Sequence, residues 1–302
     1  MHLSDKTVPI KTVPIMHLSD KAVLVHLGVS QWIAKKLDRA ASDVVATQFG
    51  ATAKAGNYNK SLLPTCNELE AVKTKTSIIR KKFYSNTLPW GIEGTFILPS
   101  ANYLAFMNEY RAEKGQWVGL VNEFYDAYPQ ACMDAQRMLG GLHKPSEYPI
   151  LTDLKKKFHM DMAIMPVPMA GDFRIELAEG EIAKITSDVE QRVIEGSKAA
   201  MDDVWQRLYD RIAWLAEKLS DPNKTFHDAT YEDAQETCKL LVRLNFTNDP
   251  DLEAMRKEVQ NKLFNTHPEV LRNDPDVRRD TATEAQVIMD KMGAFMGGTD
   301  NE

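Results

Sequence analysis

Hydrophobic residues alternate with polar ones over two short runs between residues 158 and 177. The apolar positions of these runs are Phe158, Met160, Met162, Ile164, Phe173, Ile175 and Leu177. A period of two is that of a strand with one buried face, and Pro166, Pro168 and Gly171 suit a loop between the runs. The pattern therefore predicts a β-hairpin whose apolar positions face a core.

From Glu179 the period changes to that of a helix. Apolar residues then recur at Ile182, Ile185, Val189, Val193, Ala200, Val204, Leu208, Ile212, Leu215 and Leu219. This spacing predicts one helix over residues 179–219, which at the helical rise is roughly 60 Å long. A helix of this length needs a long neighbour, and the expected one is an antiparallel helix over 101–139 that carries an aromatic stripe.

Shorter patterns complete the predicted fold. Val23, Val25, Leu27 and Val29 alternate, which predicts a strand over 22–29. Ser100 and Thr230 are expected N-caps, Asp249 with Pro250 is a third helix start, and Pro129 is expected to kink or end its helix. The other expected helices are 31–39, 43–55, 65–84, 231–244 and 281–296, with irregular chain over 87–99. The fold class is mostly α (α+β), with long antiparallel helices and a small antiparallel β-hairpin or sheet.

The first 21 residues contain an exact duplication. MHLSDK occupies 1–6 and again 16–21, and KTVPI occupies 6–10 and 11–15. A unit this short is not a solenoid repeat, so we predict a disordered tail over 1–21, with Met16 as an alternative start. A basic strand and helical region, 22–150, and a region of hairpin and helices, 151–302, are expected to follow, or one continuous domain over 22–296.

Composition is that of a globular protein without membrane spans. Hydrophobic residues make up 43% and charged residues 26%, and no run approaches the length needed to cross a bilayer. The three cysteines are widely spaced, which favours a reducing cytoplasm over a disulfide framework. Residues 1–100 hold 13 Lys and Arg against 7 Asp and Glu, whereas 101–302 hold 24 against 36. The N-terminal third therefore suits either an anionic partner or the acidic helices of its own chain.

Two short basic runs are candidates for nucleic-acid contact. The first contains Arg80, Lys81, Lys82 and Tyr84, and the second is Lys155, Lys156 and Lys157. Single strands bind where bases stack on aromatic rings while cations neutralise phosphates. A solvated helix end explains the same residues, because basic side chains suit the C-terminal end of a helix dipole.

Two further residues are candidates for contact with a protein partner. Trp90 lies in the apolar loop 86–94, which either presents the ring to a partner or tucks under the core. Arg174 lies on the polar face of the predicted hairpin, where it is free to bind a partner or forms a buried ion pair.

Motifs for common chemistry are absent from the sequence. There is no phosphate-binding glycine loop, no dinucleotide fingerprint and no zincin histidine pair, so no cofactor or metal is expected. A carboxylate cluster of the nuclease type is conceivable from Asp153, Asp161, Asp172 and Glu176. The Glu-x-Lys pair that usually completes such a site is missing, since Glu181 and Lys184 are three residues apart.

Four stretches resemble a known group of proteins. They are VLVHLGVSQWIAKK at 23–36, NTLPWGIEG with FILPSANY over 86–103, the segment 158–177, and WQRLYDRIAWLAEKLSDP at 205–222. Together they resemble an uncharacterised family of tailed phages and prophages, often encoded near a CobS- or MoxR-like AAA+ ATPase. The resemblance covers most of 22–296 and implies a bacterial host cytoplasm and a non-catalytic partner of such an ATPase. It carries no catalytic residues.

Three functions follow as hypotheses. The first is a non-enzymatic scaffold or adaptor that binds a protein, for example a AAA+ ATPase. The second is binding of single-stranded DNA through the two basic runs, and the third is a nuclease or hydrolase that uses the hairpin carboxylates.

Overall fold

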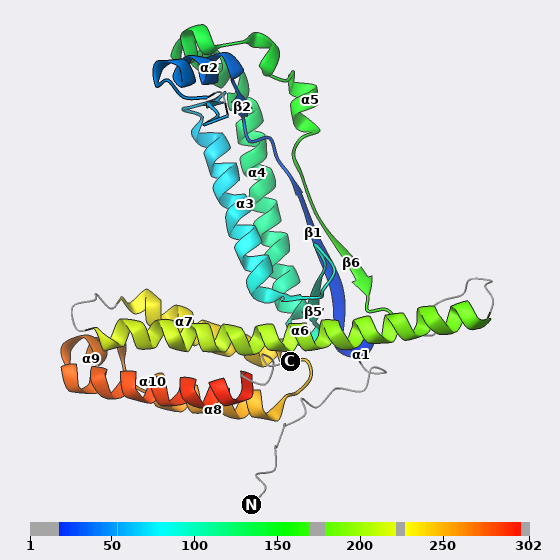
Figure 1. The fold of residues 1–302 in the computed structure, drawn as a ribbon, viewed down its shortest axis with the longest axis vertical. Helices are drawn as coiled ribbons and strands as arrows, with labels where there is room; N and C mark the ends of the chain where they lie inside the picture. The colour runs from blue at the N-terminus through cyan, green and yellow to red at the C-terminus, as the bar shows by residue number, and fades with distance from the viewer. Residues whose placement is uncertain (1–17, 53, 170–178, 222–226, 297–302) are drawn as a thin grey trace, which may run out of the picture. The chain divides into compact units, whose positions relative to one another are not determined.

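The computed structural model describes residues 18–52, 54–169, 179–221 and 227–296, most of them helical (Figure 1). The predicted fold class is confirmed: long helices accompany a small antiparallel sheet. The chain forms two compact units. Unit 1 comprises Met1–His26, Tyr84–Phe106 and Ile164–Glu302, and unit 2 comprises Leu27–Phe83 and Met107–Ala163. These units interleave along the chain, whereas the sequence suggested either consecutive regions that meet near residue 150 or one continuous domain over 22–296.

The helices and strands have the following bounds. The helices are α1 (Leu18–Lys21), α2 (Arg39–Gln48), α3 (Asn67–Asn86), α4 (Ser100–Leu139), α5 (Leu151–Lys155), α6 (Glu179–Ser220), α7 (Asp228–Leu244), α8 (Pro250–Leu263), α9 (Pro268–Asn273) and α10 (Pro275–Met296). The strands are β1 (Ala22–Ser30), β2 (Lys35–Leu37), β3 (Asn59–Ser61), β4 (Leu88–Pro89), β5 (Phe96–Pro99) and β6 (His159–Pro166).

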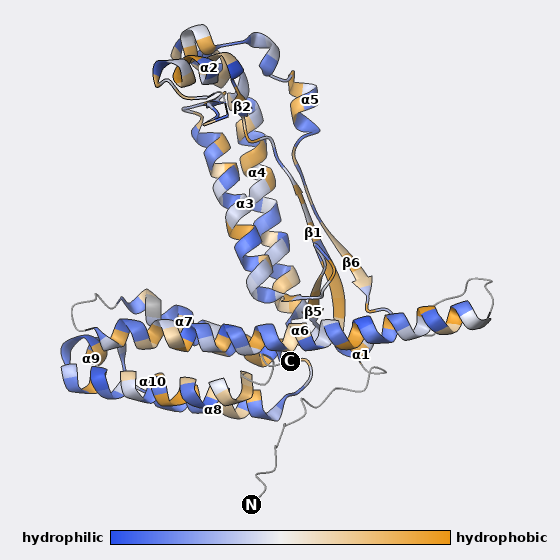
Figure 2. Ribbon diagram, in the orientation of Figure 1, coloured by the Kyte–Doolittle hydropathy of each residue, from blue (hydrophilic) through white to orange (hydrophobic). Residues whose placement is uncertain are grey.

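Unit 1 is organised around four helices that alternate in direction. α6 contacts α7, α7 contacts α8, α8 contacts α10, and α10 returns to α6 along much of its length (Figure 1). Leu208, Leu241, Val259 and Ile288, one from each helix, are almost fully buried. Their burial follows from the helical spacing of apolar residues, which places one stripe of each helix against its neighbours. Apolar residues recur along the whole of α6 (Figure 2), although residues 180–192 bury no side chain.

Helix starts in unit 1 are only partly as predicted. The Asp249 side chain accepts hydrogen bonds from the backbone N–H groups of Asp251 and Leu252, which confirms the predicted cap before Pro250. α7 instead begins at Asp228 with His227 at its N-cap, so the prediction of a cap at Thr230 is wrong.

The antiparallel sheet has the strand order β4-β5-β1-β6. β1, predicted from its alternation, pairs with β5 from Ala22 opposite Pro99 to Val25 opposite Phe96. The short strands β4 and β5 lie in the segment 87–99, which the sequence suggested to be irregular.

β6 is the predicted first strand of the hairpin. Phe158 and Met160 are buried as expected, but Ile164 is exposed, so the buried face ends before the strand does. The neighbour of β6 in the sheet is β1. The predicted second strand, with Ile175 and Leu177, lies outside the described residues.

Unit 2 is built on an antiparallel pair formed by α3 and α4. Ion pairs join Lys75 to Glu113 and Lys82 to Glu109. Residue numbers therefore increase along α3 in the direction in which they decrease along α4, so the two helices are antiparallel. A buried hydrogen bond of 2.9 Å from the Trp117 indole N–H to the Thr76 hydroxyl joins the same two helices. An aromatic cluster lies nearby along the chain, where Phe124 lies edge-on to Tyr128 and tilted against Phe158.

The predicted helix pairing is therefore wrong in one respect. α6 packs on α10 and α7, while most of α4 belongs to unit 2 and pairs with α3. Both pairings bury an apolar stripe, and a stripe alone does not identify its partner. α4 also continues through Pro129 to Leu139, and residues 35–37 form a strand where a helix was expected.

α1 lies inside the segment predicted to be a disordered tail. Leu18 is buried in the core of unit 1. The prediction is therefore wrong for 18–21, and residues 1–17 lie outside the described residues.

A close contact between α6 and the loop after β4 gives the first testable prediction. A Cβ placed on Gly196 would lie 2.9–3.1 Å from three carbons of the Trp90 ring, which is 4% exposed and held in the core. We expect Gly196→Ala to destabilise unit 1 by about 1 kcal/mol, because overpacking outweighs the gain in helix propensity. Gly293→Ala is the control, since nothing lies near a Cβ there, and should stabilise by about 0.5–1 kcal/mol. Urea unfolding of both variants tests this, and a stabilised Gly196→Ala would contradict the tight contact.

Candidate protein-binding surface

The first basic run lies on α3 in unit 2. Arg80 and Lys81 are exposed, whereas Lys82 Nζ lies 2.7 Å from Glu109 Oε1 and 2.6 Å from Glu113 Oε1. Hydrogen bonds to Glu109 and then Glu113 raise the pKa of Lys82. Lys82 is thus charged but neutralised locally, and a phosphate would have to displace two carboxylates to bind it.

The second basic run also belongs to unit 2. Lys155 Nζ lies 5.5 Å from the centre of the Tyr125 ring, and Lys156 Nζ lies 2.8 Å from Asp153 Oδ1. Lys157 is exposed at the surface. Such exposed pairs are weak, so the run is a basic surface of modest strength.

The other predicted contact residues are in unit 1 or outside the described chain. The exposed Tyr84 ring lies 5.3 Å from the ring of Phe96. Trp90 is buried against Gly196, which leaves no exposed face for a partner and matches the alternative of a loop tucked under the core. Arg174 lies in 170–178, outside the described residues.

The carboxylates considered for a hydrolytic site are not brought together as far as they are described. Asp153 pairs with Lys156, and Asp161 Oδ1 lies 3.1 Å from His159 Nε2. Asp172 and Glu176 lie in the part of the chain without a description. Over the described ranges, no group of three or more His, Cys, Asp or Glu is arranged to hold a metal ion.

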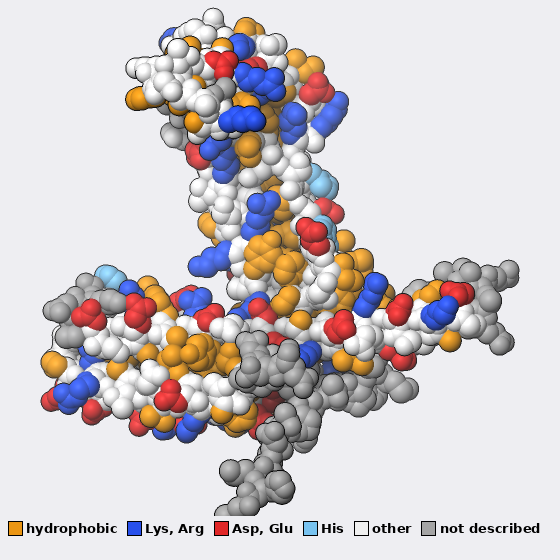
Figure 3. Space-filling model, viewed as in Figure 1, with side chains coloured by type: hydrophobic (Ala, Val, Ile, Leu, Met, Phe, Trp, Pro, Cys, Tyr) orange, Lys and Arg blue, Asp and Glu red, His pale blue; other side chains and the backbone are white. Residues whose placement is uncertain are grey.

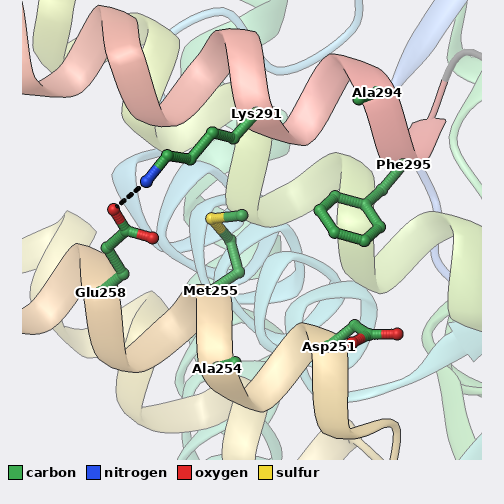
Figure 4. Close-up of a pocket in the computed structure, with 7 residues that line it drawn as sticks. All are labelled: Asp251, Ala254, Met255, Glu258, Lys291, Ala294 and Phe295. Carbon is green, nitrogen blue, oxygen red and sulfur yellow. Dashed lines mark hydrogen bonds and ion pairs between the residues drawn. The ribbon is translucent and has the colours of Figure 1, made fainter.

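A depression of about 400 Å³ lies between α8 and α10 in unit 1 (Figure 4). Met255 and Phe295 form its apolar part, and an ion pair between Glu258 and Lys291 borders it. The depression is open to solvent and lacks a cluster of converging polar groups. It therefore has few of the features of an enclosed small-molecule site.

The clearest surface feature of unit 2 is α2, which buries no side chain. Its larger apolar residues and its C-cap residue Phe49 face solvent: Phe49 is 78% exposed, Val44 65% and Val45 45%. The small residues Ala41 and Ala46 are half-buried instead. This is the reverse of the usual arrangement, in which a surface helix turns its large apolar residues to the core.

The segments before and after α2 along the chain contain further exposed apolar residues. We define the α2 surface as Ile33, Leu37, Val44, Val45, Phe49 and Tyr58, all of them exposed. Figure 3 shows hydrophobic side chains together with Lys and Arg side chains on the visible face of this part of unit 2. Single exposed apolar residues are ordinary, but several within a short stretch of chain are typical of an interaction site.

α2 is held in place at its first turn. The Asp38 carboxylate caps the helix by accepting a hydrogen bond from the Ala41 N–H, and the Asp38 N–H donates to the carbonyl of Tyr58. The Ser42 hydroxyl accepts a hydrogen bond from the Tyr58 N–H. These bonds tie α2 to the short sheet in which Leu37 of β2 lies opposite Asn59 of β3.

A buried ion network supports this first turn. Lys60 is 1% exposed, and its Nζ lies 2.8 Å from Asp38 Oδ2, 2.8 Å from Glu147 Oε2 and 2.6 Å from the carbonyl of Leu142. Burial alone would lower the pKa of Lys60, but the hydrogen bonds to Asp38 and Glu147 outweigh it and raise the pKa. The bond from Lys60 and that from the Ala41 N–H lower the pKa of Asp38 to about 2. Lys60 and Asp38 are therefore both charged at neutral pH.

Four exposed cations lie in the same stretch of chain as the α2 surface. We call Lys35, Lys36, Arg39 and Lys54 the basic rim. Within the described part of the chain, none of them forms an ion pair. Asp43 is the only exposed acid between residues 33 and 58. The surface therefore combines apolar side chains with an excess of positive charge.

Sequence reasoning placed a helix near α2 but did not identify its exposed face. Periodicity reports which residues share a face, and Val45 and Phe49 share one. It does not report whether that face meets the protein's own core or solvent. The excess of cations over residues 1–100 was the one signal that pointed to this region. Lys60, which lies between the expected helices 43–55 and 65–84, carried no signal of burial.

Comparisons with known proteins provide no relative for this chain. No family model matches it, and no curated protein or solved structure matches it either. None of the helices in the described ranges is both long and apolar enough to cross a membrane.

Proposed function

We propose that this protein is a non-enzymatic scaffold or adaptor that binds a protein partner through the α2 surface. The observation that carries the proposal is that α2 buries none of its own side chains while exposing Val44, Val45 and Phe49. Covering such side chains with a partner removes apolar area from water, at roughly 25 cal/mol for each Å². A central aromatic anchor is a common feature of protein interfaces, and Phe49 suits that role.

The anchoring of α2 also supports binding. Association costs entropy when a surface must become ordered, and a preformed surface reduces that cost. Asp38 caps the start of α2, and ion pairs join Lys60 to Asp38 and to Glu147. A surface fixed in this way presents its apolar residues in one arrangement.

Affinity capture with matched variants tests the proposal. A Val44→Asp/Phe49→Asp double variant should lose any protein that the native chain captures and that mass spectrometry identifies, because it places two carboxylates at the apolar contact. Val242→Asp is the control, since Val242 is 51% exposed on α7 in unit 1. A partner that is retained by the double variant and lost by Val242→Asp would move the binding site away from α2.

The first candidate partner is a CobS- or MoxR-like AAA+ ATPase, the class that the sequence resemblance implies. The purified ATPase and this chain should form a complex on size-exclusion chromatography if the proposal extends to that class. Failure with the ATPase alone leaves the adaptor role in place with a different partner.

Binding of single-stranded DNA is a separate hypothesis. It can be distinguished from protein binding because it involves the two basic runs and not the α2 surface. It depends on the runs at 80–82 and 155–157, where Lys82 is neutralised by Glu109 and Glu113. A gel shift at low salt that is abolished by Arg80→Glu/Lys81→Glu would support DNA binding. The same shift is expected to be insensitive to Val44→Asp/Phe49→Asp.

A further inference from the structure

We infer that the α2 surface takes an acidic amphipathic helix: a partner segment with an apolar stripe bordered by Asp or Glu. This inference rests on the proposed function and adds the chemistry of the partner. Apolar residues at helical spacing on α2 suit a second helix, because side chains three and four residues apart interdigitate with those of a facing helix. Val45 and Phe49, four residues apart and both exposed, provide such a pair.

The basic rim determines the charge of the partner. Lys35, Lys36, Arg39 and Lys54 are exposed and have no ion pair in the described chain. Asp43 is the only exposed acid between residues 33 and 58. Complementary charge around an apolar contact accelerates encounter and rejects partners of the wrong sign. Carboxylates on the border of the partner helix would meet this rim.

The same charges argue against a second copy of this chain as the occupant. Two α2 surfaces placed face to face would bring two basic rims together, and like charges across an interface are unfavourable. Bases of a nucleic acid are a poorer match than a protein helix, because they stack only on the rings of Phe49 and Tyr58, whereas the aliphatic Ile33, Leu37, Val44 and Val45 offer no ring and are covered better by apolar side chains.

An anionic membrane is also less suitable than a protein helix. Helices that lie on membranes carry Lys and Arg on their own polar face. The polar residues of α2 other than Arg39 are Ser42, Asp43, Thr47 and Gln48, which are distributed around the helix and include no cation. The cations of the rim come mostly from β2 and the loop after α2, and only Arg39 belongs to the helix.

Peptide binding to the full chain tests the inference. The probe is a labelled peptide of about 18 residues, long enough to be helical, with Leu at helical spacing and Glu at the remaining positions. Its twin has Lys in place of Glu. Fluorescence anisotropy should show binding of the Glu peptide, which weakens with salt, and about tenfold weaker or no binding of the Lys peptide.

Matched variants localise the contact. Phe49→Ser should reduce the affinity for the Glu peptide about tenfold, and so should Lys35→Glu/Lys36→Glu. Val242→Ser, on α7 in unit 1, is the control and should leave the affinity unchanged. Circular dichroism verifies that each variant is folded, which is expected because the altered side chains are exposed.

Several outcomes would overturn the inference. Equal binding of both peptides, or no binding of either, removes the acidic helix as occupant. Binding to vesicles of phosphatidylserine without peptide binding assigns the surface to a membrane, and dimerisation that Phe49→Ser abolishes assigns it to a second copy. If the peptides fail while the α2 double variant still loses a captured protein, the adaptor role stands and only the chemistry of the partner is wrong.

Discussion

Lys60→Met is expected to destabilise unit 2 by about 3–5 kcal/mol, which is a large part of the stability of an ordinary domain. The substitution keeps much of the volume and the apolar stem but removes the ammonium that lies 2.8 Å from both Asp38 and Glu147. Those two carboxylates would then be close together without a cation between them. The carbonyl of Leu142 would lose its hydrogen bond as well.

Amide hydrogen exchange followed by mass spectrometry measures this effect where it arises. Peptides that cover β2, α2 and β3 should exchange faster in Lys60→Met, while α6–α10 of unit 1 should be unaffected. Lys144→Met is the matched control: its Nζ is 3.5 Å from the same Asp38 carboxylate, but its side chain is 53% exposed. Exposed pairs contribute about 1 kcal/mol or less, so the control should change exchange little. Equal effects of the two variants would show that the buried position of Lys60 does not matter.

Neutralising Asp38 in addition to Lys60 should partly restore the stability of unit 2. Asp38→Asn retains an N-cap side chain for α2 and eliminates one uncompensated carboxylate. The double variant Lys60→Met/Asp38→Asn should therefore be more stable than Lys60→Met, because a neutral buried group is cheaper than an unpaired charge. A double variant less stable than Lys60→Met would mean that Asp38 acts on α2 independently of Lys60.

The network also determines the pH dependence of unit 2. The pKa of Asp38 is lowered from 3.8 to about 2, so its contribution is complete above 3.8 and is lost as the pH falls through about 2. The pKa of Lys60 is raised above 10.5, so its contribution is complete below 10.5 and is lost only at higher pH. Protection of α2 from hydrogen exchange should therefore be insensitive to these groups near neutrality and decline below pH 3.8.

Local patterns in the sequence were sufficient to predict the long elements. The apolar spacing from Ile182 to Leu219 predicts α6, and the alternation from Val23 to Val29 predicts β1. Asp249 followed by Pro250 identifies a helix start, because a capping carboxylate and a residue without an N–H suit adjacent positions. Each of these features depends on residues within a few positions of one another.

Features that depend on distant residues were not predictable in this way. Lys60 is buried because Asp38 and Glu147 reach it from positions far along the chain, and the residue type alone indicates exposure. α6 and α4 both carry apolar stripes, and only the fold shows that α6 meets α10 and that α4 meets α3. A helix stripe specifies that a neighbour exists but not which one.

The exposed residues of the candidate site were also not predictable from local patterns in the sequence. Trp90 was singled out for its apolar loop, and that loop is apolar because it enters the core beside Gly196. Val44, Val45 and Phe49 were unremarked because apolar residues in a helix are expected to be buried. Their exposure becomes visible only in the fold, where the smaller Ala41 and Ala46 take the inward positions.

Arg278→Ala is the second substitution expected to have a large effect, this time in unit 1. The buried guanidinium of Arg278 on α10 donates from Nε to the carbonyl of Leu219 at 3.0 Å. One of its terminal nitrogens donates to the carbonyls of Lys218 at 2.6 Å and Asp221 at 2.7 Å. These carbonyls are at the C-terminal end of α6, where the helix itself provides no donors. The positive charge also interacts favourably with the negative end of the helix dipole.

We expect Arg278→Ala to lower the free energy of unfolding of unit 1 by about 3 kcal/mol, because charge-assisted bonds are lost and partly buried carbonyls are left without donors. Arg279→Ala is the matched control: the neighbouring side chain is 70% exposed, and its ion pair with Asp276 should contribute about 0.5 kcal/mol or less. Arg278→Lys should fall between the two, since an ammonium keeps the charge but lacks the planar fork that reaches several carbonyls. Urea unfolding with hydrogen exchange on α6 separates these variants. If Arg278→Lys proves as stable as the native chain, charge at the end of α6 is the stabilising factor and the geometry of the guanidinium is not.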